Sequence, residues 1–315
     1  MVFQNDILAG SSGGSGTSTA VHTIGQSIRF NPSDNTYMYR TQDTADNKRK
    51  LTFSWWMKRG SSLGTELCIF AGGASSRFMI RMHSDDKLTF RLTNGTTEKT
   101  MTTDMVFRDV SAWYHCVWTP DCTGSISSEY SKLYVNGARV TMTGTQPSAN
   151  TDFAGYGDGS TMAISSNSHS LSSQEWDGYL AEMVLIDGQA LDPSSFGLYN
   201  DSNIWIPRDV SSLSFGTNGF HLKGENASDL GNDSSSNNND FTTSGLTSHD
   251  FMLDSPTNNF GVMNPLADYY ANHTFKNGNL ELLTSTTTSQ YTYSINNIGM
   301  SSGKWYAEMY VGSIA

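Results

Sequence analysis

The chain has 315 residues, a length that suits two domains better than one. Charged residues make up 16% of it and hydrophobic residues 37%, both below the ~25% and ~45–50% usual in soluble globular proteins. The formal net charge of −11 argues against nucleic acid or an anionic membrane as a partner, because both require a positive surface. No apolar run approaches the ~20 residues of a membrane span, so we expect no membrane insertion.

The N-terminal segment combines an apolar peptide with a flexible tether. Residues 11–20, SSGGSGTSTA, have the composition of a flexible linker. The ten residues before them contain four apolar side chains that a docking peptide could use, Val2, Phe3, Ile7 and Leu8. We interpret residues 1–23 as a docking peptide and linker, although a frayed terminus fits them equally well. The start has no basic region followed by an apolar one, so we expect no signal peptide.

The three cysteines predict neither a disulfide framework nor a zinc site. Cys68, Cys116 and Cys122 are odd in number and contain no CxxC pair. We interpret them as reduced thiols that serve as small hydrophobic side chains. A Cys116–Cys122 bridge across a hairpin is the alternative.

The region from about residue 24 to residue 206 has an all-β pattern. Short alternating segments recur between turn residues, among them KLTFSWWMKR, RFMIRMH, WYHCVWTP and GYLAEMVLIDG. Asn136-Gly137 lies between two apolar runs and is a strong hairpin signal. Many short strands separated by turns predict an antiparallel β-sandwich or barrel. One or two helical turns are expected near 190–199, with Asp192 as N-cap and Pro193 at the first helical position.

Strict alternation assigns side chains to opposite faces of two predicted strands. Trp55 and Trp56 are adjacent, so one indole should face the core and the other the opposite face. We expect the outward indole to be buried between subunits. In the later strand, the same rule places Tyr179 on one face and Leu180 on the other, with Met183 and Leu185 sharing the face of Tyr179.

The composition divides the chain into further regions. A return strand is expected near 219–223, so the main β region extends over 24–225. Residues 226–259 contain the polar tract SDLGNDSSSNNNDFTTSG and are interpreted as a linker. Residues 260–315 form a further β-rich stretch that ends with the strand-like segment GKWYAEMYVG.

Three motifs resemble a known superfamily. WYHCVWTP (113–120), KLYVNGARV (132–140) and WDGYLAEMVLIDGQALDPSSFG (176–197) resemble, in this order, the concanavalin A-like lectin/glucanase superfamily, and laminin-G-like domains most closely. The resemblance implies that 24–225 form an antiparallel concanavalin A/laminin-G-like β-sandwich.

Longer phrases resemble virion proteins of tailed bacteriophages, marine ones in particular. The opening MVFQNDILAG with its Gly/Ser linker, SIRFN, LTFSWWMKR and IDGQALDPSSFG occur together here as in those proteins. The resemblance implies a head or tail fibre or decoration protein that is attached to other virion proteins by its N-terminus and adheres to host-surface glycans or proteins. It implies a homotrimer that assembles in the host cytoplasm and is located on the virion surface.

The C-terminal segment GMSSGKWYAEMYV (299–311) resembles the early strands of a SPRY domain. A SPRY sandwich needs more strands than 260–315 supply, so we expect this partial SPRY-like region to pair its open edges with neighbouring chains.

Enzymatic residues are not expected. Glycosidases of this superfamily use two carboxylates on one strand face, and retaining ones hold them about 5–5.5 Å apart. The nearest pattern is Glu175, Asp177 and Glu182, but Glu182 has the opposite parity from Asp177 and faces away unless a bulge intervenes. A glycan depolymerase on the same sandwich is the alternative, and a secreted bacterial lectin-like adhesin is another.

The loop 150–160, NTDFAGYGDGS, is the candidate ligand site. Asp152 and Asp158 offer carboxylates for calcium, and Tyr156 could stack on a sugar. An ordinary turn without metal fits the two acids as well, and a core position fits Tyr156 equally. No His pair has metal-ligand spacing, and His115 is expected as a core or hairpin partner rather than a base. We predict no cofactor, with calcium as the one candidate ion.

Overall fold

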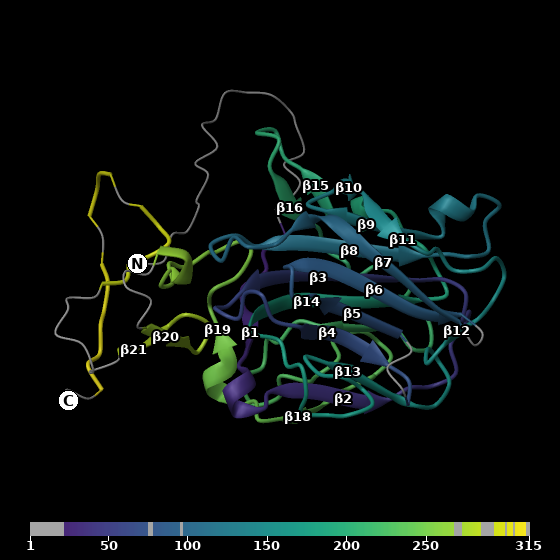
Figure 1. The fold of residues 1–315 in the computed structure, drawn as a ribbon, viewed down its shortest axis with the longest axis horizontal. Helices are drawn as coiled ribbons and strands as arrows, with labels where there is room; N and C mark the ends of the chain where they lie inside the picture. Colours follow the sequence, from purple (N-terminus) through teal and green to yellow (C-terminus); the bar gives the residue numbers. More distant parts are fainter. Residues whose placement is uncertain are drawn as a thin grey trace.

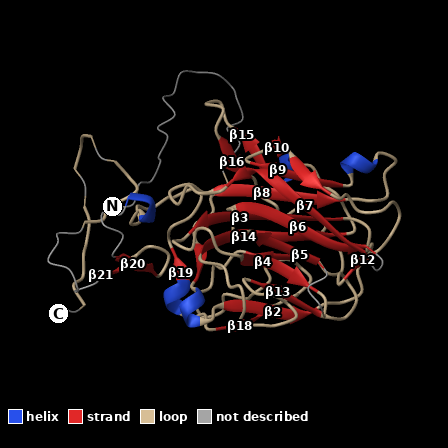
Figure 2. Cartoon of the chain, in the orientation of Figure 1, coloured by secondary structure: helices blue, strands red, loops and turns tan. Residues whose placement is uncertain are grey.

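The computed structural model describes residues 22–74, 78–94, 97–267, 273–284, 293–299, 301–304 and 306–312. Two antiparallel sheets face each other and form a sandwich (Figure 1). Helix is limited to single turns among the described residues (Figure 2). The all-β antiparallel fold class is therefore confirmed. The predicted docking residues Val2, Phe3, Ile7 and Leu8 lie outside the described residues.

The first sheet has eight strands. Its order is β10 (Ala138–Val140), β9 (Ser131–Val135), β8 (Tyr114–Pro120), β3 (Leu51–Arg59), β14 (Gly178–Asp187), β1 (Ser27–Phe30) and β19 (Phe251–Met252), and β17 (Phe220–Leu222) also pairs with β14. Strand β17 confirms the return strand predicted near 219–223.

The second sheet has nine strands. Its order is β11 (Met142–Gly144), β7 (Thr97–Val106), β6 (Lys87–Asn94), β5 (Phe78–Met82), β4 (Leu67–Gly72), β13 (Thr161–Ile164), β2 (Tyr37–Thr41) and β18 (Thr242–Ser244), and β12 (Phe153–Ala154) pairs with β6.

Two hairpins lie outside the sheets. They are β15 (Gly197–Tyr199) with β16 (Trp205–Pro207), and β20 (His273–Lys276) with β21 (Glu281–Thr284). The 3₁₀ turns are η1 (Pro32–Asp34), η2 (Ser127–Glu129), η3 (Pro193–Ser195), η4 (Ser248–Asp250) and η5 (Pro265–Ala267). Turn η3 has Asp192 as N-cap and Pro193 at its start, as predicted.

Among the described residues, none of the helical segments has the length and apolar character that a membrane-spanning helix needs.

The core lies between the two sheets. Alternate residues of β3, including Phe53 and Trp55, point into it, and Phe53 stacks on Phe70 of the opposite sheet with ring centroids 4.7 Å apart. Cys68, Cys116 and Cys122 are buried free thiols, as the odd count indicated.

Strand β14 contains a β-bulge that the alternation rule did not foresee. The pairing with β3 shifts register between Ala181 and Val184, and Glu182 has a φ of 47°. A bulge adds one residue to one strand and inverts the alternation beyond it. Leu180, Met183 and Leu185 therefore all belong to the main core, whereas Tyr179 packs on the outer face. The prediction that Met183 and Leu185 share the face of Tyr179 is wrong for this reason.

Residues 226–259, predicted as a linker, are part of the sandwich. Strand β18 extends the second sheet beside β2, and β19 extends the first sheet beside β1. The polar tract folds on itself, since the Asp233 carboxylate accepts hydrogen bonds from the backbone N–H groups of His221 (2.8 Å) and Asn239 (2.8 Å). Asn and Asp side chains that bond to backbone groups stabilise turns, so a polar composition alone did not distinguish a linker from ordered turns.

The C-terminal stretch differs from its predicted strand pattern. Hairpin β20–β21 forms, but the described residues 301–304 and 306–312 contain no strand. Tyr306, Met309 and Tyr310 are exposed. An alternating pattern becomes a strand only where a neighbouring strand supplies hydrogen-bond partners.

A buried ion pair fixes residues 254–260 on the outer face of β3. The Lys58 side chain is 0% exposed, and its Nζ donates to Asp254 Oδ2 (2.8 Å), Asn259 Oδ1 (2.8 Å) and the Phe260 carbonyl (2.9 Å). Trp113 Nε1 donates to the other Asp254 oxygen at 3.1 Å. Burial lowers the pKa of Lys58, while the Asp254 carboxylate opposes this shift.

Removing one member of this pair should destabilise the protein strongly. Asp254→Ala leaves the Lys58 ammonium buried without its counter-charge, which costs about 3–5 kcal/mol of unfolding free energy. Urea unfolding followed by tryptophan fluorescence measures this loss. The double variant Lys58→Met/Asp254→Leu removes both charges and should recover part of it. A loss below about 1 kcal/mol for Asp254→Ala would show that the pair does not anchor the segment.

Candidate functional site

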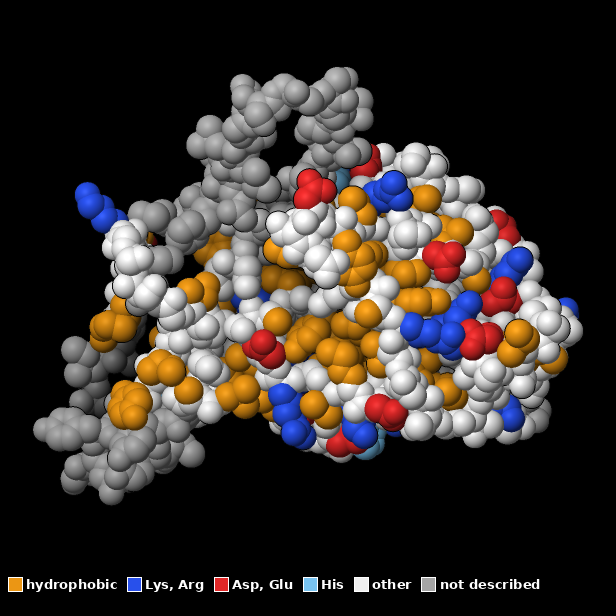
Figure 3. Space-filling view, turned by 90° about the horizontal axis from the view of Figure 1, so that it is seen from above, with side chains coloured by type: hydrophobic (Ala, Val, Ile, Leu, Met, Phe, Trp, Pro, Cys, Tyr) orange, Lys and Arg blue, Asp and Glu red, His pale blue; other side chains and the backbone are white. Residues whose placement is uncertain are grey.

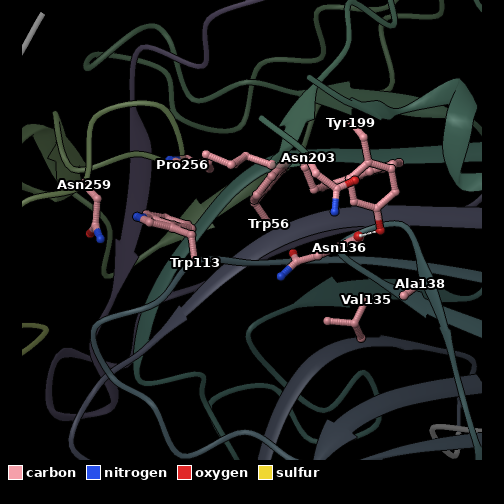
Figure 4. A pocket seen from close by; sticks show the side chains of 11 residues that line it. Trp56, Trp113, Val135, Asn136, Ala138, Tyr199, Asn203, Pro256 and Asn259 are labelled. Carbon is pink, nitrogen blue, oxygen red and sulfur yellow. Dashed lines mark hydrogen bonds between the residues drawn. The ribbon is translucent and has the colours of Figure 1, made fainter. Parts of the chain in front are cut away.

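An aromatic pocket opens on the outer face of the eight-stranded sheet (Figure 4). Its volume is about 540 Å³, within the ~300–1,000 Å³ of ordinary ligand sites. Its lining is formed by Trp56, Trp113, Val135, Asn136, Ala138, Tyr199, Asn203, Ile204, Trp205, Pro256 and Asn259. Figure 3, seen from the side where β15 and β16 lie, shows hydrophobic side chains gathered near the middle and charged ones mostly around them.

Trp56 forms the floor of this pocket. Strand alternation sends Trp55 into the core and Trp56 to the outer face, as predicted. Trp56 is only 5% exposed and stacks on His115 with centroids 4.5 Å apart. It packs with Trp113 and Trp205 of its own chain. The expectation that this indole is buried between subunits is therefore wrong, because the chain covers it itself.

Trp205 is held by the hairpin turn that the sequence predicted. Asn136 and Gly137 have φ angles of 48° and 78° and connect β9 to β10. A Cβ on Gly137 would lie 2.4 Å from the Trp205 ring, so only glycine allows the indole this approach. Trp205 Nε1 donates to His115 Nδ1 at 2.9 Å, which fixes the in-plane orientation of the ring.

His115 is a neutral support beneath the pocket. Because its Nδ1 accepts from Trp205, its ring proton is on Nε2, which lies 2.9 Å from Ser54 Oγ. Burial lowers the pKa of His115 to about 3. The prediction that His115 is a core partner is confirmed by this burial.

The rim of the pocket supplies polar groups and exposed apolar surface. Tyr199 is 48% exposed, and its hydroxyl donates to the Asn136 carbonyl at 2.8 Å. Ile204 is 59% exposed. The carboxamides of Asn203 and Asn259 lie on exposed residues of the rim. Figure 4 shows Trp113 and Asn259 toward one side, Tyr199 and Asn203 toward the other, and Trp56 between them.

The loop predicted as a ligand or calcium site does not line this pocket. Tyr156 is fully buried and donates its hydroxyl to Asp187 Oδ1 at 2.6 Å, so its ring cannot stack on a sugar. Asp152 pairs with Arg49 at 2.7 Å, and Asp158 accepts from the backbone N–H of Ser160 at 3.1 Å. Across the described part of the chain, no group of three or more His, Cys, Asp or Glu could hold a metal ion.

Of the acidic residues around β14, Asp177 and Glu182 do not form a close pair. The bulge turns Glu182 outward, but it stands five residues beyond Asp177, on the order of 15 Å at ~3.3 Å per residue. Asp177 accepts from the backbone N–H of Ser62 at 2.7 Å. Burial alone would raise the pKa of Glu182, but the imidazoles of His22 (3.5 Å) and His221 (2.7 Å) outweigh it and lower the pKa to about 2. A carboxylate with that pKa is a poor general acid.

The two-layer antiparallel sandwich that carries the pocket has a lectin-like fold. Residues 32–195 match the sequence profile of Laminin_G_3, the concanavalin A-like lectin/glucanases superfamily. The chain belongs to this superfamily, and the match confirms the resemblance seen in its strand motifs. Among curated proteins, none matches the chain.

Three solved structures are similar to part of the chain. A heptameric SAP-like pentraxin from Limulus polyphemus is 18% identical with a TM-score of 0.41, covering 54% of this chain and 79% of the pentraxin. Domains LG4-5 of the mouse laminin alpha1 chain are 13% identical with a TM-score of 0.39, and the match covers 59% of this chain and 48% of the laminin chain. Tailspike protein 2 of Escherichia coli O157:H7 bacteriophage CAB120 is 11% identical with a TM-score of 0.40, and the match covers 55% of this chain and 24% of the tailspike. The chain thus spans under half of the laminin pair and about a quarter of the tailspike.

The pocket was not foreseen in the sequence. Trp113 belongs to a family motif, but no sequence pattern identified Tyr199, Asn203 or Trp205 as site residues. A usable signal is the segment LYNDSNIWIP, where two aromatic residues flank an Asn-rich turn. Such a turn between aromatic residues predicts a short hairpin that presents both rings on one side.

The neutral state of His115 predicts a specific pH dependence. The unfolded chain binds a proton on this histidine below about pH 6.5, whereas the folded chain does so only near its pKa of about 3. Stability is therefore complete above about pH 6.5 and declines as the pH falls toward 3. Between about pH 6.5 and 5, before Glu182 titrates, His115 should contribute a loss of about 2 kcal/mol to the unfolding free energy measured in urea. The raised pKa of His22 acts in the opposite direction and offsets part of this loss.

The matched variants separate His115 from the other histidines. His115→Gln should remove most of this decline, and His249→Gln, which changes an exposed residue, should preserve it. An unchanged pH profile in His115→Gln would contradict the assignment of a neutral imidazole at this position.

Proposed function

We propose that the aromatic pocket is a glycan-binding site and that the protein is a non-enzymatic adhesion module. The observation that carries this proposal is the composition of the lining, where three tryptophans and Tyr199 meet the carboxamides of Asn136, Asn203 and Asn259.

This composition suits sugars for a physical reason. A pyranose ring has apolar C–H faces that pack on aromatic rings, and its hydroxyl groups lie at the ring edge. The Asn203 carboxamide and the Asn136 amide nitrogen can bond to the hydroxyls of a sugar. Asn136 Oδ1 already accepts from the backbone N–H of His115 at 2.9 Å, and the Asn259 carboxamide is held by Lys58 and by the Ser111 carbonyl. Trp205 is locked by His115 and Gly137, so little conformational entropy is lost when a sugar binds.

The same lining supports a binding role rather than hydrolysis. Among the described residues that line the pocket there is no carboxylate and no imidazole. Glycoside hydrolysis usually needs two carboxylates, one as acid and one as base or nucleophile. The alternative, a glycan depolymerase on this sandwich, would need its acids elsewhere.

The setting of the module is proposed from the sequence. Its phrases resemble virion proteins of tailed bacteriophages, so we place the protein on the virion surface as a head or tail fibre or decoration protein. Val2, Phe3, Ile7 and Leu8 would dock it on other virion proteins, and the Gly/Ser linker would give it reach. In a trimer, binding at one weak glycan site would raise the effective concentration of ligand at the other two, so the overall avidity would exceed the affinity of a single site.

Tyr199→Ala should weaken glycan binding without changing the fold. The ring is half exposed, so its removal costs little stability but takes away one stacking surface, worth about tenfold in affinity. Labelled protein on an array of bacterial surface polysaccharides and oligosaccharides measures this loss. Tyr39→Ala, on the other sheet, is the control. Equal glycan binding by Tyr199→Ala and the unaltered protein would refute the proposal that glycans bind in this pocket. Release of reducing sugar from the glycans would favour the alternative of a glycan depolymerase.

Deleting residues 1–10 should abolish incorporation into particles while leaving the sandwich folded. Immunogold electron microscopy of purified virions, with an antibody against residues 24–206, shows whether the protein is present and whether it decorates head or tail. Normal incorporation of the deletion variant would contradict the proposal that residues 1–10 dock the protein on the particle. Absence of the full-length protein from virions would reject the virion setting and favour the secreted lectin.

A further inference from the structure

A second pocket adjoins the first on the far side of hairpin β15–β16. Its volume is about 330 Å³, and Gly137, Ser194, Leu198 and Arg208 contribute to its lining. Tyr199 and Trp205 line both pockets. The two hollows therefore have a common wall that includes these two aromatic side chains.

The shared aromatic wall is fixed in place. A Cβ on Gly137 or on Gly197 would lie 2.4 Å from the Trp205 ring, so the backbone closely flanks the indole at two positions. Tyr199 and Trp205 contact each other edge to face, with centroids 5.0 Å apart.

Arg208 gives the second pocket a charge that the first one lacks. Arg29, Arg40, Arg49, Arg59, Arg81, Arg91, Arg108 and Arg139 all form ion pairs. Arg208 is the one arginine in the described ranges that has no ion pair. In a protein with a net charge of −11, an unpaired arginine at a pocket is unusual.

The guanidinium of Arg208 is held but not saturated. The Nη1 atom of the guanidinium donates to the Ser194 carbonyl at 2.8 Å. The backbone N–H of Arg208 donates to the Phe196 carbonyl at 2.9 Å. A guanidinium has five N–H donors, so most remain for a ligand. Its planar fork matches a carboxylate, which it binds through two parallel hydrogen bonds.

We infer that the two pockets form one extended site for an acidic oligosaccharide. A neutral sugar stacks in the first pocket, and a neighbouring sugar that bears a carboxylate, such as a uronic acid, pairs with Arg208 in the second. This inference rests on the proposed glycan-binding function and specifies its ligand class.

The test compares acidic glycans with their own neutral forms. The probes are uronate-containing oligosaccharides and their carboxyl-reduced counterparts, printed on one array, so that linkage is constant and only the charge differs. The unaltered protein should bind the acidic members about tenfold more tightly, and added salt should reduce this preference.

Three variants assign the preference to Arg208. Arg208→Gln should lose the preference while keeping its affinity for the reduced forms, which also shows that the first pocket is intact. Arg208→Lys keeps the charge without the fork and should retain part of the preference. Arg91→Gln, on β6 of the other sheet, changes the net charge equally and should leave the preference unchanged.

The outcomes separate this inference from the proposed function. Equal affinity for acidic and reduced forms, or a loss in Arg208→Gln that affects both alike, overturns the inference. Tyr199-dependent binding to neutral glycans alone also overturns it but leaves the proposed function standing. No binding to any printed glycan refutes both.

Discussion

Strand β3 is buried on both of its faces, and much of the molecule follows from that constraint. All nine of its residues are buried, including Trp56 and the charged Lys58 on the outer side. A strand at the centre of a sheet with apolar side chains on both faces requires a second covering layer. Here the cover comes from hairpin β15–β16 and from residues 254–260, the latter tied down by the Lys58–Asp254 pair.

The pocket results from this covering layer being incomplete. The covering segments bury Trp56 and Trp113 but leave Tyr199 half exposed beside them. Beneath the pocket, a neutral His115 connects Ser54 of β3 to Trp205 of the cover. The contacts of His115 are thus satisfied without charge, whereas Trp113 and Asn259 are held by the Lys58–Asp254 ion pair. Arg208, which lines the second pocket, belongs to the cover itself.

The site lies only partly within the superfamily match, which includes Trp56, Trp113 and Asn136. The match ends at residue 195, whereas Tyr199, Trp205, Arg208 and Asn259 all lie beyond it. The sandwich is a common scaffold, and a fold of this kind does not determine a ligand. We therefore derive the proposed ligand from the covering segments rather than from the superfamily.

The sequence by itself determined the all-β fold class, the faces of β3 and the Asn136-Gly137 turn, because these depend on local periodicity and turn chemistry. Its resemblance to the superfamily rested on the order of three motifs. The bulge at Glu182 and the ordered turns of 226–259 needed tertiary structure, since they depend on which strand or backbone group lies opposite. The pocket needed it most of all. Its walls come from residues as far apart as Trp56 and Asn259, and only the packing of the cover on β3 brings them together.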